Sequence, residues 1–230
     1  MNDSLLALLR RIDTPTVCNA IEVAQGKRGF DAFTRGTMLC SADGPAMVGY
    51  ARTARIRALK PPSEAPEVIR ARRRGYYEYM SAGPRPAIAV VQDMDVPHAI
   101  GAYWGEINTN IHKAFGLSGA LTDGVMRDLG DLPEGFPVVA GSIGPSHGFV
   151  QVVDFDQPVV IQGLDVAPDD LVHADRHGAV VIPPDVLAHL QAAIEQLFAS
   201  ERIVLDAVKG RQIDFAEFET IWQAFEASRT

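Results

Sequence analysis

The sequence has few cysteines and no long apolar run, and each shortage excludes a class of protein. Its 230 residues include two cysteines, Cys18 and Cys40, whose spacing fits neither a metal site nor a disulfide framework. We therefore expect reduced thiols in a cytoplasmic protein. The start of the chain lacks the basic and apolar segments of a secretory signal, and no apolar run approaches the roughly 20 residues that span a bilayer. No membrane partner is expected.

Positive charge is also in short supply. The chain carries 21 lysines and arginines against 29 aspartates and glutamates, a formal net charge of −8. A nucleic-acid groove needs a basic surface. A basic and aromatic run at residues 70–79 could indicate RNA binding, but we interpret it as the solvated face and end of a helix, with cations near the negative C-terminal dipole. We therefore expect no nucleic-acid partner.

Hydrophobic periodicity predicts alternating strands and helices in the middle of the chain and helices at both ends. The expected strands are 47–56, 87–92, 119–122, 137–140, 149–154, 158–161 and 179–182. The expected helices are 4–11, 16–23, 64–80, 105–115, a short one near 127–129, 184–208 and 215–227. In the helix 105–115, Ile107, Ile111 and Ala114 share one side. This order indicates an α/β or α+β core in a single domain over 1–230, with N-terminal helices in 1–25 and C-terminal helices in 184–230.

Three features that favour chemistry coincide in residues 101–131. Gly105 and Glu106 stand at an expected helix start, where free backbone N–H groups and the helix dipole form an anion site. The glycine lets a ligand carboxylate approach the backbone closely. Downstream, a short strand runs into a turn at residues 123–124, and ligands in α/β sheets collect beyond the carboxyl ends of strands.

The third feature, the pair Arg127–Asp128, follows that turn closely. Arginine offers a planar fork suited to a carboxylate or an enolate oxygen. Aspartate is a hard oxygen ligand suited to Mg²⁺, which binds through one or two carboxylates plus waters. An Arg-Asp dipeptide alone is usually a surface charge pair that contributes less than about 1 kcal/mol. Together with the glycine turn upstream, the pair indicates a site that stabilises an enolate.

The spacing of these residues resembles that of a known family. Twenty residues separate Glu106 from Arg127, which is similar to the acidic-x20-Arg-Asp signature of the RraA-like family. That family includes the class II pyruvate aldolases, among them the 4-hydroxy-4-methyl-2-oxoglutarate aldolases, and the regulators of ribonuclease activity. Further similar stretches are 48–54, like the family's early strand, 158–166, like its late hairpin, and 173–183, like the strand before its final helices. The resemblance covers residues 12 to 210.

The resemblance implies a compact α/β sandwich with a swivelling-domain-like core and flanking terminal helices. It implies a homotrimer or homohexamer with active sites at subunit interfaces. Asp128 would hold a divalent metal, Mg²⁺ or Mn²⁺ or another, largely through waters, and Arg127 would contact the oxygens of a pyruvate-like moiety. Glu106 would order a water on the metal that serves as base or acid. The backbone that would take the substrate carboxylate is that of Gly105, Glu106, Ile107 and Asn108.

The activity implied is that of a metal-dependent carbon–carbon lyase acting on 2-keto acids. Retro-aldol cleavage of a 4-hydroxy-2-oxo acid and decarboxylation of oxaloacetate both leave the enolate of pyruvate, so one site can perform both. The alternatives are a non-catalytic regulator that binds a ribonuclease or another protein, and a related enzyme with a different substrate. The sequence departs from the family's Pro-Gly-Asp turn at Pro168-Asp169-Asp170. Glu201 is the candidate for the acidic residue that characterised aldolases take from a neighbour's C-terminal helix.

Other residues allow two interpretations each. His147 could line the pocket, or could be a phosphohistidine like that of phosphotransferase swivelling domains, which use a Ser-His pair after glycines, but a structural or loop role fits it better. His173, Asp175 and His177 could share one face of a strand and bind a metal, although their position before Gly178 favours a turn held by hydrogen bonds.

Three further side chains lie beside the expected pocket. Asp93 and Asp95 end a strand, where turn capping is expected rather than ligand binding. Trp104 precedes Gly105 and is expected to be a core residue rather than a wall of the substrate site. No G-x-G-x-x-G or P-loop pattern supports nucleotide binding.

Overall fold

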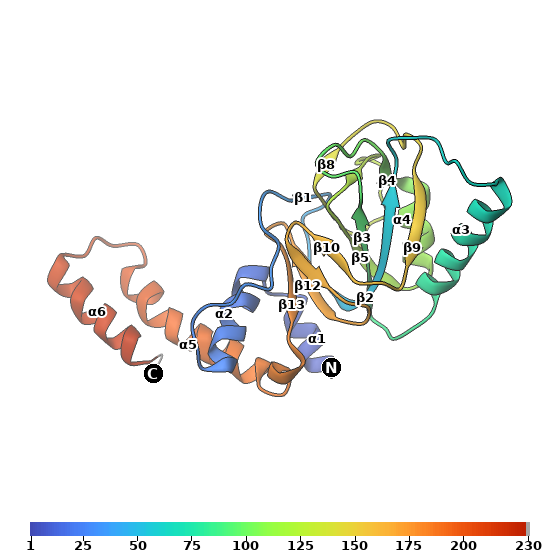
Figure 1. Cartoon of the computed structure of the whole chain (residues 1–230). Coiled ribbons are helices and arrows are strands. Elements are labelled where there is room, and N and C mark those ends of the chain that lie inside the picture. The colour runs from blue at the N-terminus through green and yellow to red at the C-terminus, as the bar shows by residue number, and fades with distance from the viewer. Residues whose placement is uncertain (229–230) are drawn as a thin grey trace.

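The computed structural model describes residues 1–228 as a mixed α/β sandwich around one eight-stranded sheet (Figure 1). The strands run in the order β1, β7, β5, β3, β2, β12 and β13, and β9 also pairs with β2. Their bounds are β1 Leu39–Cys40, β2 Met47–Arg57, β3 Ala87–Asp93, β5 Leu117–Thr122, β7 Val138–Ala140, β9 Gln151–Phe155, β12 Leu171–Asp175 and β13 Gly178–Ile182. The central strands β7, β5, β3 and β2 are parallel, and the outer pairings are antiparallel. The α/β class expected from the sequence is confirmed.

Strand β2 is shared by three neighbours. On one side it pairs in parallel with β3 from Tyr50 to Ile56. On the other side its first residues pair with β12, and its last residues, from Ala54 to Arg57, pair with β9 with a register shift between Arg55 and Ile56. Cores pack on both faces of β2, so it is buried along most of its length. The strand expected at 47–56 is confirmed.

Helices cover the sheet and extend the chain at both ends. Their bounds are α1 Asp3–Leu9, α2 Thr14–Gln25, α3 Pro66–Ser81, α4 Glu106–Ala114, the 3₁₀ turn η1 Pro184–Val186, α5 Leu190–Val208 and α6 Phe215–Ala227. Asn2 and Asp13 cap α1 and α2 through their side chains. The apolar faces of α1, α2 and the first half of α5 form one core with β12 and β13. Among residues 1–228, no helix is long and apolar enough to cross a membrane.

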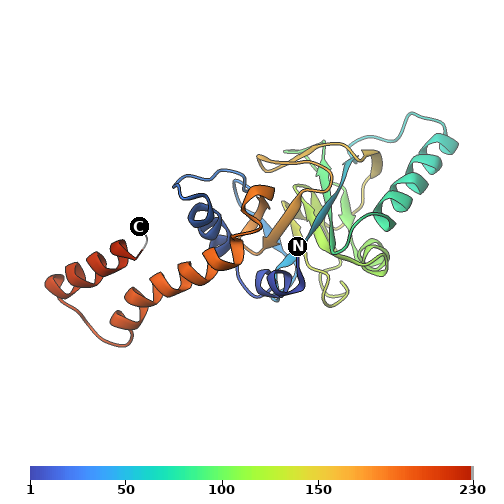
Figure 2. The ribbon, with the colours of Figure 1, turned by 90° about the horizontal axis from the view of Figure 1, so that it is seen from below.

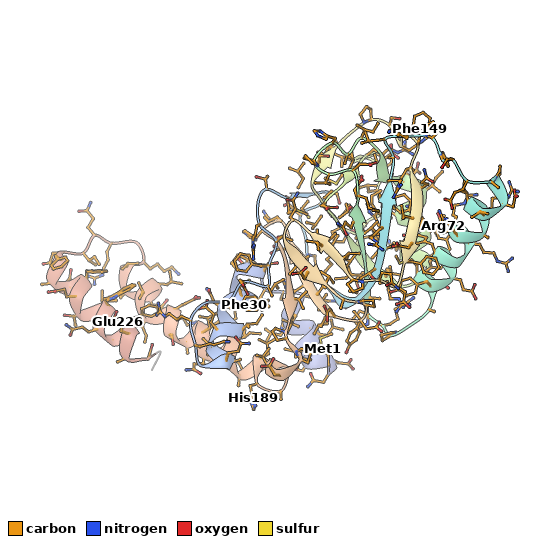
Figure 3. The ribbon with its side chains drawn as sticks, viewed as in Figure 1. Met1, Phe30, Arg72, Phe149, His189 and Glu226 are labelled. Carbon is orange, nitrogen blue, oxygen red and sulfur yellow. The ribbon has the colours of Figure 1, made fainter. Side chains whose placement is uncertain are left out.

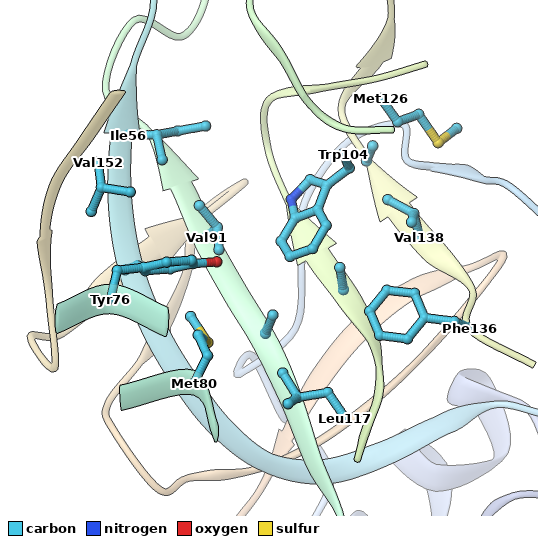
Figure 4. Packing of buried hydrophobic residues seen from close by; sticks show 14 of the residues in the cluster. Ile56, Tyr76, Met80, Val91, Trp104, Leu117, Met126, Phe136, Val138 and Val152 are labelled. Atoms are coloured by element: carbon cyan, nitrogen blue, oxygen red, sulfur yellow. The ribbon is translucent and has the colours of Figure 1, made fainter. Parts of the chain in front are cut away.

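Successive residues of the central strands point into two further cores. In β3, Ala89 and Val91 belong to the core beneath α3 and α4, whereas Ile88 and Val90 belong to the core beneath a small hairpin. Figure 4 shows the first of these cores, in which Trp104 lies among side chains from several strands. The hairpin over the second core is formed by β10 Val159–Ile161 and β11 Leu164–Val166, as the sequence resemblance implies.

A second, three-stranded sheet continues from the first. It contains β4 Ala102–Trp104, β6 Val125–Met126 and β8 Ser142–Ile143, all parallel. Only Asp123 and Gly124 separate β5 from β6, and only Gly141 separates β7 from β8. Two strands of the main sheet therefore continue into the small sheet, and the carboxyl ends of β4 and β6 come to lie side by side.

The C-terminal arm, defined here as residues 201–228, stands away from this body in both ribbon views (Figures 1 and 2). It comprises the second half of α5 and the helix α6, which packs back on α5. None of the residues of α6 within the described range is buried. Glu226, labelled in Figure 3, lies on this arm far from the sheet.

Four sequence expectations are wrong. The helix α4 buries Asn108, Thr109 and His112 rather than the apolar side, and Ile107 is 72% exposed. Arg127 and its neighbours are not helical, because Met126 belongs to a strand and Asp128 has a left-handed backbone. The helix expected over 184–208 is broken into η1 and α5. The basic run at 70–74 also lies in the middle of α3, without a basic residue in the last turn.

Candidate active site

The candidate site lies where β4 and β6 end. The strands are parallel neighbours, so the residues that follow them leave the sheet together. After β4 the chain turns at Gly105 and enters α4, and after β6 it continues into Arg127 and Asp128. The Arg127 N–H donates to the Trp104 carbonyl at 2.8 Å, which extends the pairing by one residue. Two segments twenty residues apart in sequence are thereby joined.

Asp128 caps the helix of the other segment. Its backbone φ is 57°, a left-handed conformation that aspartate tolerates better than most residues. Its Oδ2 accepts a hydrogen bond from the Glu106 N–H at 3.1 Å. The helix α4 has no side-chain cap of its own at Gly105, so Asp128 supplies both the acceptor and the negative charge favoured at a helix start.

Gly105 is required by close approach rather than by its backbone angles. Its φ of −134° suits any residue. A Cβ built there would stand 2.5 Å from Asp128 Oδ2 and 3.0 Å from Cγ and Nε of Arg127. Only glycine therefore lets the carboxylate and the guanidinium lie directly against the start of α4.

Arg127 has hydrogen-bonding capacity to spare. Its Nε is buried and has no partner among the described residues, and its Nη1 lies 3.4 Å from Asp128 Oδ1. The side chains of Arg127 and Asp128 are 32% and 29% exposed. A guanidinium with an unused buried donor and an open face suits an anionic group with two oxygens.

The remaining predicted residues divide into two groups. The side chains of Glu106 and Ile107 are exposed beside Asp128 at the start of α4. The Asn108 side chain is instead used within the chain, since Nδ2 donates to the Tyr103 carbonyl and Oδ1 accepts from the Tyr77 hydroxyl. Any contact of Asn108 with a substrate carboxylate would therefore have to use its backbone N–H.

A buried network that the sequence analysis missed holds α4 in place. His112 Nδ1 lies 2.6 Å from the Asn108 carbonyl, which only accepts, so Nδ1 carries the proton. Nε2 then accepts from the Tyr76 hydroxyl at 2.7 Å. Burial lowers the pKa of His112 to about 4, which keeps the ring neutral. The signal was available in the sequence, because Asn108 and His112 are four residues apart on one helix face.

The other singled-out residues lie outside this site. His173 is fully buried and bonds to Thr14 and to the Leu9 carbonyl, while His177 bonds to Asp175. Only the Asp175–His177 contacts form the hydrogen-bonded turn that the sequence favoured, whereas His173 joins the sheet to the N-terminal helices. His147 is an exposed loop residue whose ring nitrogen meets the Gly148 carbonyl.

Two side chains close to the site have structural contacts. Asp95 accepts from the N–H groups of Ala58 and Leu59 in another segment, and the expected turn cap is instead made by Asp93, which accepts from the Asp95 N–H. Trp104 is a fully buried core residue, as expected. Glu201 begins the C-terminal arm, and both ribbon views show that arm standing away from the sandwich.

Comparisons with known proteins identify the family and the fold. The fold is an α/β sandwich whose short parallel strands present an arginine and an aspartate at a helix start. A family model described as Aldolase/RraA matches residues 14–181, more than half of the chain. The chain therefore belongs to the RraA-like family, which confirms the resemblance seen in the sequence.

Solved structures share the fold at low identity. An uncharacterized protein from Pseudomonas syringae pv. tomato aligns with 22% identity over 99% of this chain and 95% of its own, at a TM-score of 0.72. RraAS2 from Streptomyces coelicolor, described as an unusual member of the RNase ES inhibitor RraA protein family, aligns with 23% identity over 92% and 98%, at 0.63. Protein DlpA of Legionella pneumophila is 26% identical over 55% of this chain, and the match spans only 22% of DlpA.

Proposed function

We propose that this protein is a divalent-metal-dependent carbon–carbon lyase that acts on pyruvate-containing acids. The observation that carries the proposal is the close contact at Gly105, where Asp128 caps α4 and Arg127 keeps an unused buried donor. This arrangement gathers a carboxylate, a guanidinium and the first N–H groups of a helix within one small surface. Family membership supports the same conclusion, because the family includes aldolases of this kind.

The residues fit a water-rich metal site at Asp128. Its carboxylate is partly exposed: Oδ2 accepts from the Glu106 N–H, and Oδ1 has only a long contact of 3.4 Å with Arg127 Nη1. Within residues 1–228 there is no group of three or more His, Cys, Asp or Glu side chains that could hold an ion, so water would complete the shell. Mg²⁺ accepts such a site, with one or two carboxylates plus waters, and Mn²⁺ or another divalent ion could replace it. When bound, the ion would supply positive charge next to the keto oxygen of the substrate.

Substrate binding follows from the remaining groups. The Glu106 N–H is taken by Asp128, so the N–H groups of Ile107 and Asn108 are those of the first turn left for the substrate carboxylate. The Arg127 guanidinium would bind the 2-keto oxygen and a carboxylate oxygen together. Both contacts would orient the substrate so that the bond to be cleaved, between its carbons C3 and C4, faces the open side of the site.

When that C–C bond breaks, its electron pair stays with C3 and is delocalised onto the keto oxygen. In the retro-aldol reaction, Glu106 accepts the proton of the 4-hydroxyl through a water, the 4-carbon becomes a carbonyl, and the enolate of pyruvate remains. In decarboxylation of oxaloacetate, CO₂ leaves and the same enolate forms. Arg127 stabilises the charge on the enolate oxygen, and protonation at C3 gives pyruvate.

The test is pyruvate release from oxaloacetate and from 4-hydroxy-4-methyl-2-oxoglutarate, with and without EDTA. We expect Arg127→Ala and Asp128→Ala to lower the rate at least about a hundredfold. Arg28→Ala and Asp165→Ala change exposed residues of the same types and serve as controls. A protein-free blank corrects for the decarboxylation that free metal ions catalyse. Equal rates for all variants would contradict the proposal.

A second candidate function is regulation of a ribonuclease. RraAS2 shares the fold and is described as a member of an RNase ES inhibitor family, and the net charge of −8 suits a basic partner surface. A stoichiometric ribonuclease complex, together with no turnover of either 2-keto acid, would favour this function. In both cases we propose a homotrimer or homohexamer in which a neighbour's arm completes the site.

A further inference from the structure

A separate cavity of about 440 Å³ opens at the carboxyl ends of β3 and β5, against the β10–β11 hairpin. Its volume is typical of a small-molecule site. Neither Arg127 nor Asp128 lines it, so it is distinct from the candidate active site. The carboxyl ends of parallel strands are where α/β sheets commonly bind ligands.

The floor of this cavity is acidic. Asp93 and Asp123 line it and are 1% and 8% exposed. The Asp93 N–H donates to Asp123 Oδ1 at 2.7 Å, and Asp93 Oδ1 accepts from the Asp95 N–H at 3.0 Å. Asp93 Oδ2 is buried and has no partner among the described residues. A buried carboxylate oxygen without a donor is costly, and a ligand that brings one would remove that cost.

The wall of the cavity carries the opposite charge. Arg35 is exposed and lines the cavity. Its backbone N–H donates to the Gln162 carbonyl in the turn between β10 and β11. No ion pair involves the Arg35 side chain within residues 1–228. The cavity therefore places a free cation and an unsatisfied buried carboxylate around one small space.

The mouth of the cavity is apolar. Met94, Val96 and Val160 line it and are 43%, 39% and 41% exposed. Side chains of this kind suit an aliphatic group rather than a hydrated ion. Two carboxylates alone also fall short of the donor set a metal needs, and the described residues hold no group of three. An organic ligand is therefore favoured over a bare cation.

We propose that this cavity binds a small zwitterion of the amino-acid class. The ammonium group would donate to Asp93 and Asp123 on the floor, the carboxylate would pair with Arg35, and the aliphatic part would lie against the apolar mouth. Such a ligand would supply the donor that Asp93 Oδ2 lacks. It would also tie the β10–β11 hairpin to the ends of β3 and β5.

The first experiment screens each standard amino acid against the purified full chain in EDTA, by thermal shift and calorimetry at millimolar concentration. The tightest binder is compared with the amine that lacks its carboxylate and with the acid that lacks its amino group; for leucine these are isoamylamine and 4-methylpentanoate. We expect the amino acid to bind more tightly than either. No binding by any amino acid would overturn the proposal, and equal binding by the amine would overturn the role of Arg35.

The second experiment locates the ligand with matched variants. Asp93→Asn and Arg35→Gln should each weaken binding about tenfold or more, because each removes a charge-assisted contact. Asp165→Asn and Arg28→Gln change exposed residues outside the cavity and should leave the affinity unchanged. Asp128→Ala should also bind normally, because the candidate active site is separate. Unchanged affinity in Asp93→Asn would overturn the proposal.

Discussion

The body of the molecule and its C-terminal arm contain similar apolar residues at very different exposure. In the body, Leu121 is fully buried and Phe136 is 2% exposed. In the arm, Leu205 is 60% and Phe215 is 71% exposed. The body completes its own core, whereas the arm presents apolar surface of the kind that marks interaction sites. This difference supports the proposal that the arm packs against another copy.

The aromatic residues of α6 make the contrast sharper. Phe218 stacks on Trp222 with ring centroids 5.7 Å apart, and Phe215 lies 5.9 Å from Phe218. A capping box formed by Asp214 and Glu217 fixes the start of the helix. These three side chains, Phe215, Phe218 and Trp222, form an aromatic row along one helix. The body of the molecule does not bury this row.

The largest expected effect comes from one substitution made in both regions. Leu121→Ala should lower the free energy of unfolding by about 2–5 kcal/mol, because it leaves a cavity in a packed core. Leu205→Ala should change it by less than about 0.5 kcal/mol in dilute protein, where the arm is uncovered. Chemical denaturation followed by circular dichroism measures both. Equal losses would show that the arm belongs to the cooperative core.

The second prediction compares buried and exposed carboxyls. Burial raises the pKa of Asp93 from 3.8 to about 6, so the folded state holds the proton more tightly than the unfolded state. The contribution of the Asp93 carboxyl to the free energy of unfolding is present at low pH. It falls by about 3 kcal/mol as the pH rises from about 4 to 6. Asp93→Asn should therefore gain stability relative to wild type over that interval, and the arm variant Glu219→Gln should not.

The comparison must be made between variants because another group acts in the opposite direction. The neutral His112 ring stabilises the fold above its ordinary pKa of 6.5, and that stability is lost as pH falls toward about 4. The wild-type profile contains both effects and also that of Asp123, whose pKa burial likewise raises to about 6. A difference between Asp93→Asn and wild type that stays constant with pH would refute this prediction.

The third prediction concerns how tightly the body packs at the candidate site. Gly105→Ala places a methyl group against Asp128 Oδ2, so we expect lyase activity and metal affinity to fall about tenfold or more, which corresponds to about 1.4 kcal/mol. The control is Gly130→Ala, since a Cβ there meets nothing within 4 Å. Steady-state kinetics and metal titration provide the measurements. Full activity in Gly105→Ala would show that the close approach is dispensable.

The smallest expected effect on folding comes from the aromatic row. Replacing Phe218 and Trp222 together by serine should leave unfolding of the body within about 0.5 kcal/mol of wild type. The same change should reduce the proposed trimer or hexamer to smaller species in light scattering coupled to gel filtration. An unchanged oligomer would show that the arm is not the contact between copies.

The sequence predicts elements better than it predicts their orientation. The strand at 47–56 is recognised because it alternates and carries β-branched residues, but the structure buries both of its faces, which alternation does not predict. The helix 105–115 is also recognised, but its buried side is wrong, since His112 and Asn108 are satisfied by Tyr76 and Tyr77, which are distant in sequence. Polar residues can form a core face only when such partners exist, and one chain segment does not reveal them.

The site shows the same limit. Arg127 and Asp128 are singled out from their spacing to Glu106, and the structure does bring them to the start of α4. The reason for Gly105, a close contact with Asp128, requires the pairing of β4 with β6. The proximity of Asp93 and Asp123 likewise depends on the pairing of β3 with β5, and turn capping was the natural expectation from sequence.

The length of the helix α5 sets the distance between the body and the aromatic row. Its 19 residues span almost 30 Å at about 1.5 Å each, and its first half is fixed in the core by residues such as Ile194 and Leu197. The reach of the aromatic row and the direction in which it faces are therefore set by counting residues. One inserted residue would turn the row by about 100°, whereas seven would nearly restore its phase about 10 Å further out.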